Sequence, residues 1–323
     1  MSLIGGVVGA SKLLNFNIKK LLNAMGIAGA SCPILAGQKW EDIEGPSIMC
    51  KYNAWAGWCA QLATVAALMA EKGFTGDPSI FDGELDFGLI SGSGFFKPEI
   101  LMGNLGKDWH ILKSAPKAYP CCRANHSGIQ ALQKIILENE IKISEIKEIK
   151  VMGDLFLLEP NRKALDIENS IDTQFSNAYI FAVAAIYPDF AGPLWQMPIL
   201  YNRPEIKKLA RKIKVEIHPK TYDMLKESAK KGVKITSMTS RAIIPNVLVK
   251  VKTEKEEYIG EEFAPKGTIN NPMSEIEILD KFKGNSCFSL ITQSKIEKSI
   301  DLIQNLEKLE NLEKLMGLLR IKS

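Results

Sequence analysis

The chain has 323 residues, of which 46% are apolar, and its 41 basic and 37 acidic residues leave a formal net charge of +4. This length exceeds the range in which one hydrophobic core keeps growing, so we expect two domains. The near balance of charge, with lysines spread along the chain, argues against a protein that binds nucleic acid, and no apolar run is long enough to span a membrane. The chain starts without a basic segment ahead of its short apolar run, so we expect a cytoplasmic protein with six reduced cysteines.

The first part of the chain is helical in pattern. Residues 7–31 predict two short helices by the spacing of their apolar residues, with Gly26 and Gly29 ending the run. Residues 54–72 predict a helix with one stripe of large apolar side chains and an opposite face of small ones, ended by Gly73. Because a helix that is apolar or small all round avoids water, we expect this helix to be buried.

A different pattern, strands mixed with helices, extends from about Lys107 to Gly267. Alternating and β-branched residues predict strands, and apolar residues at helical spacing predict helices. We expect strands at 107–112, 146–153 and 213–218, a hairpin over 245–263, and helices at 123–140 and 172–186.

The last part of the chain returns to helices. Ser274 and Glu277 form a capping box at the start of one helix, and apolar residues from Ile296 to Leu309 continue a helical tail. The sequence therefore predicts a mainly helical body (1–106 and 268–323) with an α+β domain inserted at 107–267.

Two short motifs invite a functional interpretation and favour a structural one. Adjacent Cys121 and Cys122, with the other cysteines scattered, match neither a zinc site nor an iron–sulfur site, so we interpret them as structural. The Ser91–Gly94 segment lacks the residues of a phosphate-binding loop and is interpreted as a turn.

The segment KAYPCCRANHSG at 117–128 is a candidate anion site. If a helix begins near Pro120, Cys122 and His126 lie on one face, and Lys117 and Arg123 add positive charge at the helix N-terminus, where carboxylates bind well. The alternative is that both cations are ordinary surface charges and the histidine lies in the core.

Two further residues are ambiguous taken singly. Lys51 directly precedes the apolar helix of residues 54–72, so it either extends to solvent or reaches into a cleft as an anion clamp. Tyr179 lies on the apolar face of the helix predicted at 172–186 and is by default a core tyrosine with a hydrogen-bonded hydroxyl.

Taken together, these segments resemble the MmgE/PrpD family, whose name-giving member is 2-methylcitrate dehydratase. The matches follow the family's order along nearly the whole chain. They are GWCAQLATVAALMAEKGFTG with IFDG after it, KAYPCCRANHSGIQAL, DTQFSNAYIFAVAAIY and APKGTINNPMSEIEILDKF.

The resemblance implies a helical domain with an α+β lid domain, and dehydration, decarboxylation or epimerisation of a small polycarboxylic acid without metal or organic cofactor. It assigns active-site roles to Lys51, Lys117 and Tyr179. Some relatives have a histidine where this chain has Cys122, and His126 is a conceivable substitute. Proton abstraction next to a carboxylate needs cations that stabilise the developing charge. We therefore expect Lys51 and Lys117 to converge on one pocket, with Tyr179 as a donor and Arg123 and His126 in support.

One part of the family's pattern has no counterpart here. Relatives carry an Asp and a His in a helical segment ahead of the region matched, and residues 1–50 contain no such motif and no histidine. Three hypotheses follow: an active lyase or isomerase, which the family implies to be a homodimer; a non-catalytic protein that binds a polycarboxylate; and a split enzyme whose site is completed by a second chain.

Overall fold

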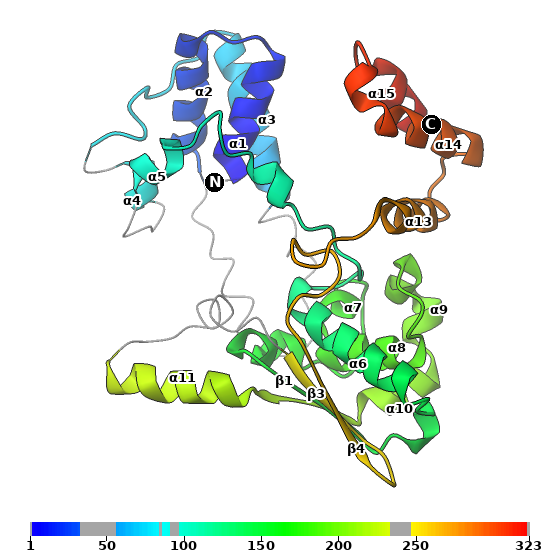
Figure 1. Ribbon diagram of the computed structural model, residues 1–323. Helices are drawn as coiled ribbons and strands as arrows, with labels where there is room; N and C mark the ends of the chain where they lie inside the picture. The colour runs from blue at the N-terminus through cyan, green and yellow to red at the C-terminus, as the bar shows by residue number, and fades with distance from the viewer. Residues whose placement is uncertain (1, 33–55, 84–85, 91–96, 233–246, 322–323) are drawn as a thin grey trace. The chain divides into compact units, whose positions relative to one another are not determined.

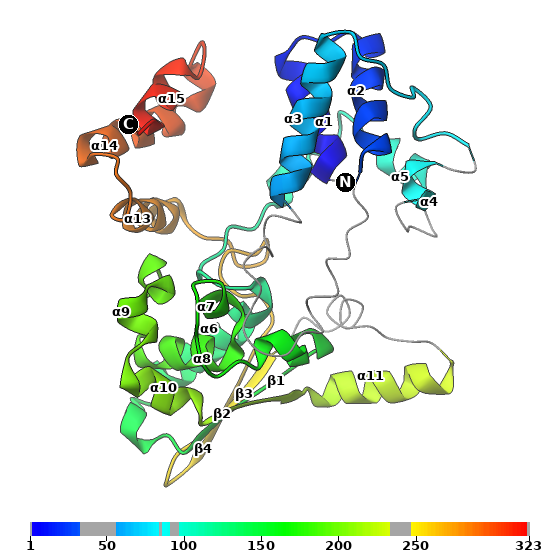
Figure 2. The same ribbon diagram turned by 180° about the vertical axis from the view of Figure 1, so that it is seen from behind.

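The computed structural model describes residues 2–32, 56–83, 86–90, 97–232 and 247–321, which form two compact units. Unit 1 holds the described residues up to Leu112, and unit 2 holds those from Lys113 onward (Figures 1 and 2). The predicted fold class, mainly helical with an α+β part, is confirmed by the helices of both units and the mixed sheet of unit 2. None of the described helices has the length and apolar character needed to cross a membrane.

Unit 1 is built on three helices that pack against one another in every pairing (Figure 1). The side chain of Asn17 accepts a hydrogen bond from the Lys20 backbone N–H and so caps the second of these helices. The two short helices predicted near the start are therefore confirmed. The elements of unit 1 are α1 (Ser2–Leu13), α2 (Ile18–Ala30), α3 (Trp58–Glu71), α4 (Phe87–Ile90), α5 (Pro98–Met102) and the 3₁₀ helix η3 (His110–Lys113), whose last residue belongs to unit 2.

The prediction that Gly26 and Gly29 end a helix is wrong, because α2 continues through both to Ala30. The glycines serve close packing instead. A Cβ added at Gly26 would lie 2.3 Å from the backbone oxygen of Asp77, and one at Gly29 would lie 2.5 Å from the Ile80 side chain. The helix tolerates two glycines because only a hydrogen atom fits between it and the 77–80 segment.

The prediction that the helix of residues 54–72 is buried all round is also wrong. The buried side of α3 is the small one, which lets α1 and α2 approach closely. Trp58, Val65 and Leu68 on the larger side are 55%, 43% and 47% exposed. Gly73 has a φ of +89°, which confirms the predicted glycine stop. The buried residues of α3 are Cys59, Ala63, Ala66, Ala67 and Ala70.

Residues 107–112 do not form the predicted strand. They pass from a turn into η3, and they pair with no strand of the described chain. Ile111 and Leu112 are 75% and 81% exposed, so their apolar character has no core to face. Alternation of apolar and polar residues makes a strand only where a neighbouring strand accepts its hydrogen bonds.

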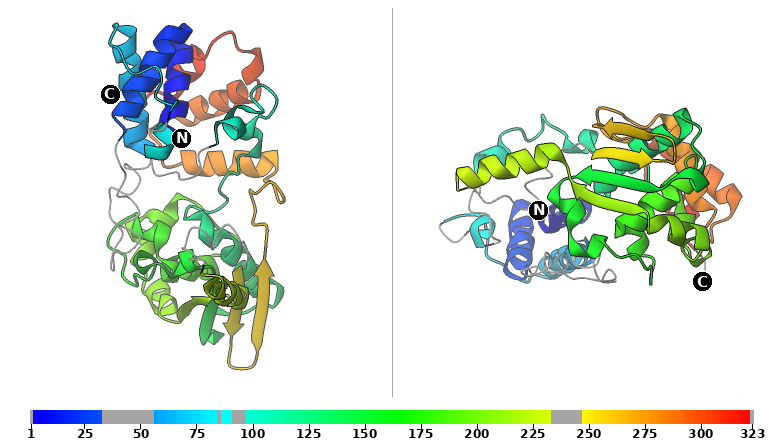
Figure 3. Two further views of the ribbon diagram at one scale, coloured as in Figure 1. Left: turned by 90° about the vertical axis from the view of Figure 1, so that its left-hand side faces the viewer. Right: turned by 90° about the horizontal axis from the view of Figure 1, so that it is seen from below.

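Unit 2 is organised around a four-stranded sheet in the order β2-β1-β3-β4 (Figure 3). β1 runs parallel to β2 and antiparallel to β3, and β3 and β4 form the predicted hairpin. One face of the sheet, with Val249 and Val251 fully buried, packs on helices α6 (His126–Glu138) and α8 (Asn177–Ile186). The other carries ion pairs such as Lys150–Glu216 at 3.0 Å. The strands are β1 (Glu148–Gly153), β2 (Ile213–Ile217), β3 (Val247–Lys252) and β4 (Glu257–Glu262).

The helices of unit 2 differ from prediction mainly at their ends. The helix predicted at 123–140 starts with a 3₁₀ turn, η4 (Arg123–Asn125), before α6 (His126–Glu138). The helix predicted at 172–186 breaks at Ser176, whose extended backbone lets its hydroxyl cap the second half. The remaining helices before the return are α7 (Asp172–Phe175), α8 (Asn177–Ile186), α9 (Pro198–Tyr201), α10 (Pro204–Ala210) and α11 (Pro219–Lys230), with 3₁₀ helices at Ile143–Glu145, Leu155–Leu158, Pro160–Arg162 and Pro193–Gln196.

The predicted capping box is confirmed at the start of α13 (Glu275–Ser286), where the side chains of Ser274 and Glu277 each accept a bond from the other's backbone N–H. The predicted continuous helical tail is interrupted. Asn305 ends the first tail helix, and Leu306 and Leu309 lie beyond it. The tail elements are α14 (Gln293–Gln304), the 3₁₀ helix η9 (Leu306–Lys308) and α15 (Glu313–Leu319).

Candidate functional site

A pocket of about 310 Å³ opens on unit 2 where the segment that precedes α6 meets α13 and the turn at residues 191–196. The Gln196 amide donates to the Pro120 carbonyl at 3.0 Å and so holds two of these segments together. The described lining includes basic, amide and aromatic side chains and no acidic one. The described residues that line it are Lys117, Ala118, Tyr119, Pro120, Ala191, Gly192, Pro193, Gln196, Lys281 and Asn285.

Two lysines give this pocket its charge. Lys117 belongs to the segment before α6. Lys281 lies on α13, and its ammonium donates a hydrogen bond to the backbone carbonyl of Lys117. Burial, followed by the charges of Lys117 and Arg123, lowers the pKa of Lys281. The three cations therefore share one region of positive potential, which suits an anionic ligand.

His126 lies behind the pocket and is neutral at physiological pH. Its imidazole is fully buried at the first residue of α6 and packs edge-on against Tyr119, with ring centroids 5.1 Å apart. Burial, and next the charge of Arg123, lower the pKa of His126 to about 3. The Tyr119 hydroxyl in turn donates to Gln133 at 2.8 Å, and burial raises the pKa of Tyr119 to about 12.

Arg123 stands in η4, one turn ahead of His126, and its guanidinium donates to the Ala115 carbonyl. The regular helix starts at His126 and not near Pro120, so the premise that Cys122 and His126 share a helix face is wrong. The backbone of Cys122 is extended and its N–H donates to the Gln174 carbonyl at 2.9 Å. Pro116 and Pro120 disfavour a helical backbone at Ala115 and Tyr119, the residues that precede them.

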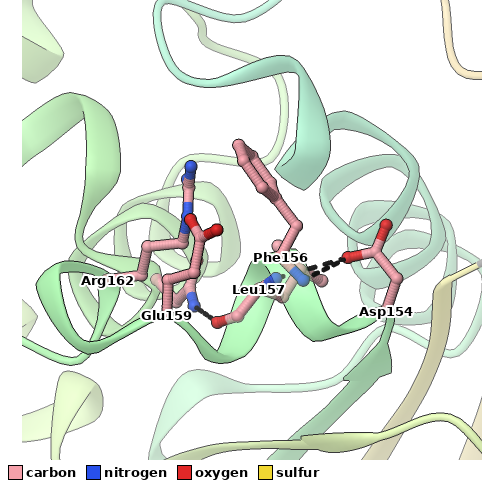
Figure 4. A network of polar contacts seen from close by, with 6 residues as sticks. Asp154, Phe156, Leu157, Glu159 and Arg162 are labelled. Atoms are coloured by element: carbon pink, nitrogen blue, oxygen red, sulfur yellow. Dashed lines mark hydrogen bonds and ion pairs between the residues drawn. The ribbon is translucent and has the colours of Figure 1, made fainter. Parts of the chain in front are cut away.

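The side chain of Cys122 belongs to a small apolar cluster with Phe156, Ile171 and Phe175. Next to it lies the polar network shown in Figure 4, where Asp154 accepts bonds from the Phe156 and Leu157 backbone N–H groups. Glu159 and Arg162 belong to the same network. The Arg162 side chain is fully buried and pairs with Glu159 at 3.2 Å. It also stacks on the Phe156 ring, with its carbon Cζ 3.9 Å from the ring centroid.

The neighbouring Cys121 is also a core residue. Burial raises the pKa of its thiol, which keeps it protonated and unreactive at physiological pH. The described residues hold no group of three or more His, Cys, Asp or Glu side chains that could hold a metal ion.

Tyr179 lies in the core of unit 2 and is not among the residues that line the pocket. Its hydroxyl donates to the Trp195 backbone carbonyl, and burial raises the pKa of Tyr179. Trp195 also stacks on Tyr119, with centroids 6.2 Å apart. Tyr179 therefore supports the Tyr119 wall of the pocket from behind.

Lys117, Arg123 and His126 thus lie in one region of unit 2, since burial and the charges of both cations lower the pKa of the histidine. Cys122 and Tyr179 are turned into apolar clusters beside that region. Lys51 lies outside the described residues, so its predicted convergence with Lys117 stays a prediction.

Sequence reasoning missed Lys281. A signal for it was present, because the last segment that resembles the MmgE/PrpD family ends in Lys281-Phe282. Its importance depends on a contact with Lys117, which lies 164 positions away, and no local pattern reports such a contact.

Comparison with known protein families agrees with the ordered motifs. The MmgE/PrpD C-terminal domain matches residues 119–308, which include every residue of the pocket lining from Tyr119 to Asn285. The chain belongs to the MmgE/PrpD family. The family's N-terminal domain matches residues 2–95, so residues 2–50, where the motifs showed no counterpart, are also similar to the family.

One curated relative is the cis-aconitate decarboxylase of Aspergillus terreus. It is 23% identical over 335 aligned residues, which include 97% of this chain and 62% of the relative. The chain therefore spans less than two thirds of the length of that enzyme.

Proposed function

We propose that this protein is a lyase that acts on a small polycarboxylic acid and begins by removing a proton next to a carboxylate. The observation that carries the proposal is the pocket of unit 2, where Lys117 lies in a basic lining that lacks acidic side chains among its described residues. Membership of the MmgE/PrpD family and similarity to a cis-aconitate decarboxylase support the same class of substrate.

In this proposal Lys117 binds a substrate carboxylate and stabilises the negative charge that develops beside it. Arg123 adds to the positive potential, and Lys51 is proposed as a further carboxylate ligand. His126 supports the Tyr119 wall in its neutral form, and Cys122 packs in the apolar cluster beside this region. Tyr179 is proposed as the donor, which requires that its hydroxyl leave the Trp195 carbonyl when substrate binds.

The test is turnover of three acids by the full chain: 2-methylcitrate, cis-aconitate and iminodisuccinate, followed by absorbance and proton NMR. We expect one of them to be converted, and Lys117→Ala to lower kcat/KM at least a hundredfold, because a charge-assisted contact to the reacting group is lost. Lys134→Ala is the matched control, since this exposed lysine on α6 forms only a surface pair with Glu138. Equal turnover by Lys117→Ala and the control would remove Lys117 from the site.

A second candidate function is binding of a polycarboxylate without conversion. It is favoured by the described pocket lining, which includes neither a carboxylate nor an imidazole that could serve as the base. Calorimetric binding of the three acids together with absent turnover would select this function. Turnover that appears only after a second chain is added would select the split enzyme.

We also propose that the chain forms a homodimer, as the family resemblance implies, and that it is cytoplasmic. The exposed apolar side of α3 in unit 1 is consistent with burial against another surface. Sedimentation velocity of the purified chain tests the dimer, with a single species at the monomer mass as the result against it.

A further inference from the structure

Three contacts link helix α13, the turn before it, helix α6 and the segment that carries Lys117. The Lys266 ammonium pairs with Glu277 at 2.9 Å in the first turn of α13. The Lys266 backbone N–H donates to the Gln130 side chain of α6 at 2.7 Å. Lys281, one turn after Glu277, then reaches the Lys117 carbonyl.

Gly267 makes this arrangement possible. It has a φ of +87°, and a Cβ built on it would lie 2.0 Å from the Pro116 carbonyl oxygen. The chain therefore turns sharply and touches the backbone of the Lys117 segment just before α13 begins. The position of Lys281 beside Lys117 follows from this backbone contact rather than from the lysine side chain alone.

Both lysines line the same pocket, and burial and the charge of Lys117 lower the pKa of Lys281, so their ammonium groups repel each other when no anion is near. Each described residue of the pocket lining is neutral or basic, so none of them balances the charge of Lys281. The pocket, at about 310 Å³, has room for a small organic acid. A ligand with one carboxylate can satisfy one ammonium, and a ligand with two can satisfy both.

We propose that Lys281 is a specificity-determining residue, which binds a second carboxylate of the ligand and makes the pocket select acids with two or more carboxylates. This inference rests on the proposed function, because it assumes that Lys117 binds the first carboxylate. It adds to that function a second ligand-binding residue and a preference among substrates. A monocarboxylate would leave the Lys281 ammonium without a carboxylate partner, so it should bind less well than an acid with two or more carboxylates.

The experiment is calorimetric titration of the full chain with three acids of related carbon chain: propane-1,2,3-tricarboxylate, glutarate and butyrate. We expect Lys281→Gln to weaken binding of the tricarboxylate and glutarate at least about tenfold, as for loss of a charge-assisted hydrogen bond. Butyrate affinity should change less than twofold. Lys281→Arg should keep the tricarboxylate affinity within about threefold, because it retains the charge.

Lys283→Gln is the matched control, since this residue is exposed on the same helix and does not line the pocket. Circular dichroism of each variant checks that α13 is intact. If Lys281→Gln weakens all three acids alike, or none, the specificity role is overturned while the proposed function stands. If the unmodified chain binds none of the acids, the pocket is not a carboxylate site and both proposals fall together.

Discussion

At the scale of single residues, the pocket wall depends on groups that are buried without charge. His126 and Tyr119 face each other in the core, and burial moves their pKa values in opposite directions, to about 3 for the imidazole and about 12 for the phenol. Both shifts favour the neutral form. The positive charge is therefore carried by the two lysines of the pocket lining, which agrees with a site that binds anions.

The histidine shift predicts how stability depends on pH. The folded chain protonates His126 only near pH 3, whereas an unfolded chain does so near pH 6.5, so the unfolded state holds more protons in between. The free energy of unfolding should fall as pH is lowered through this interval, by up to about 1.4 kcal/mol per pH unit. Urea unfolding at a series of pH values measures the slope.

His126→Gln should flatten that slope, because it removes the titrating group. A residual slope is expected from His218, whose pKa burial also lowers. His110→Gln is the control, since His110 is exposed in η3 and lies outside the core of unit 2. An unaltered slope in His126→Gln would contradict the assignment.

At the scale of elements, glycines and alanines decide which helix faces meet. Gly26 brings α2 against the backbone at Asp77, and Gly6 of α1 leaves room for Ala63 of α3, where an added Cβ would lie 2.8 Å away. Large apolar side chains mark a helix as amphipathic, but in unit 1 the contact itself is made by the small ones. This explains why the prediction of a helix buried all round missed the exposure of the larger side of α3.

Gly26→Ala is expected to destabilise unit 1 by about 1–3 kcal/mol, because the new methyl group overlaps backbone that has no rotamer to change. Gly9→Ala in α1 is the matched control: its Cβ meets nothing within 4 Å. Alanine has the higher helix propensity, so this control should gain roughly 0.5–1 kcal/mol. Chemical unfolding followed by circular dichroism compares the two, and equal effects would contradict the packing argument.

At the scale of the whole molecule, the candidate pocket is contained in one unit. Its lining runs from Lys117 to Asn285, and the apolar core beneath it is drawn from residues 119–251. The contacts at Gly267 and Lys281 bring the start and the end of this stretch together. Unit 2 thus has what an independent domain needs: its own core and a closed set of backbone contacts.

A fragment of residues 113–323 should therefore fold alone, with a cooperative thermal transition and the sheet signal of the full chain. Differential scanning calorimetry measures this. The fragment should also bind propane-1,2,3-tricarboxylate if the pocket lining is sufficient for the ligand. A broad, non-cooperative transition would show that unit 2 depends on unit 1 for its stability.

Much of the secondary structure was predictable because its causes are local. Val247, Val249 and Val251 alternate into the core, Ser274 and Glu277 cap α13, and Gly73 stops α3, as expected from spacing alone. The strand predicted at 107–112 failed because a strand needs a partner, and no local pattern states whether one is present.

The family, the fold class and the region of the candidate site could be predicted before the fold was known, because they depend on ordered motifs and on the spacing of apolar residues along the chain. Tertiary structure decided that Lys281 joins Lys117, that Cys122 and Tyr179 turn into the core, and that α3 buries its small face. Each of these outcomes depends on contacts between distant segments. Such contacts are chosen by how the folded backbone fits together and not by neighbouring residues.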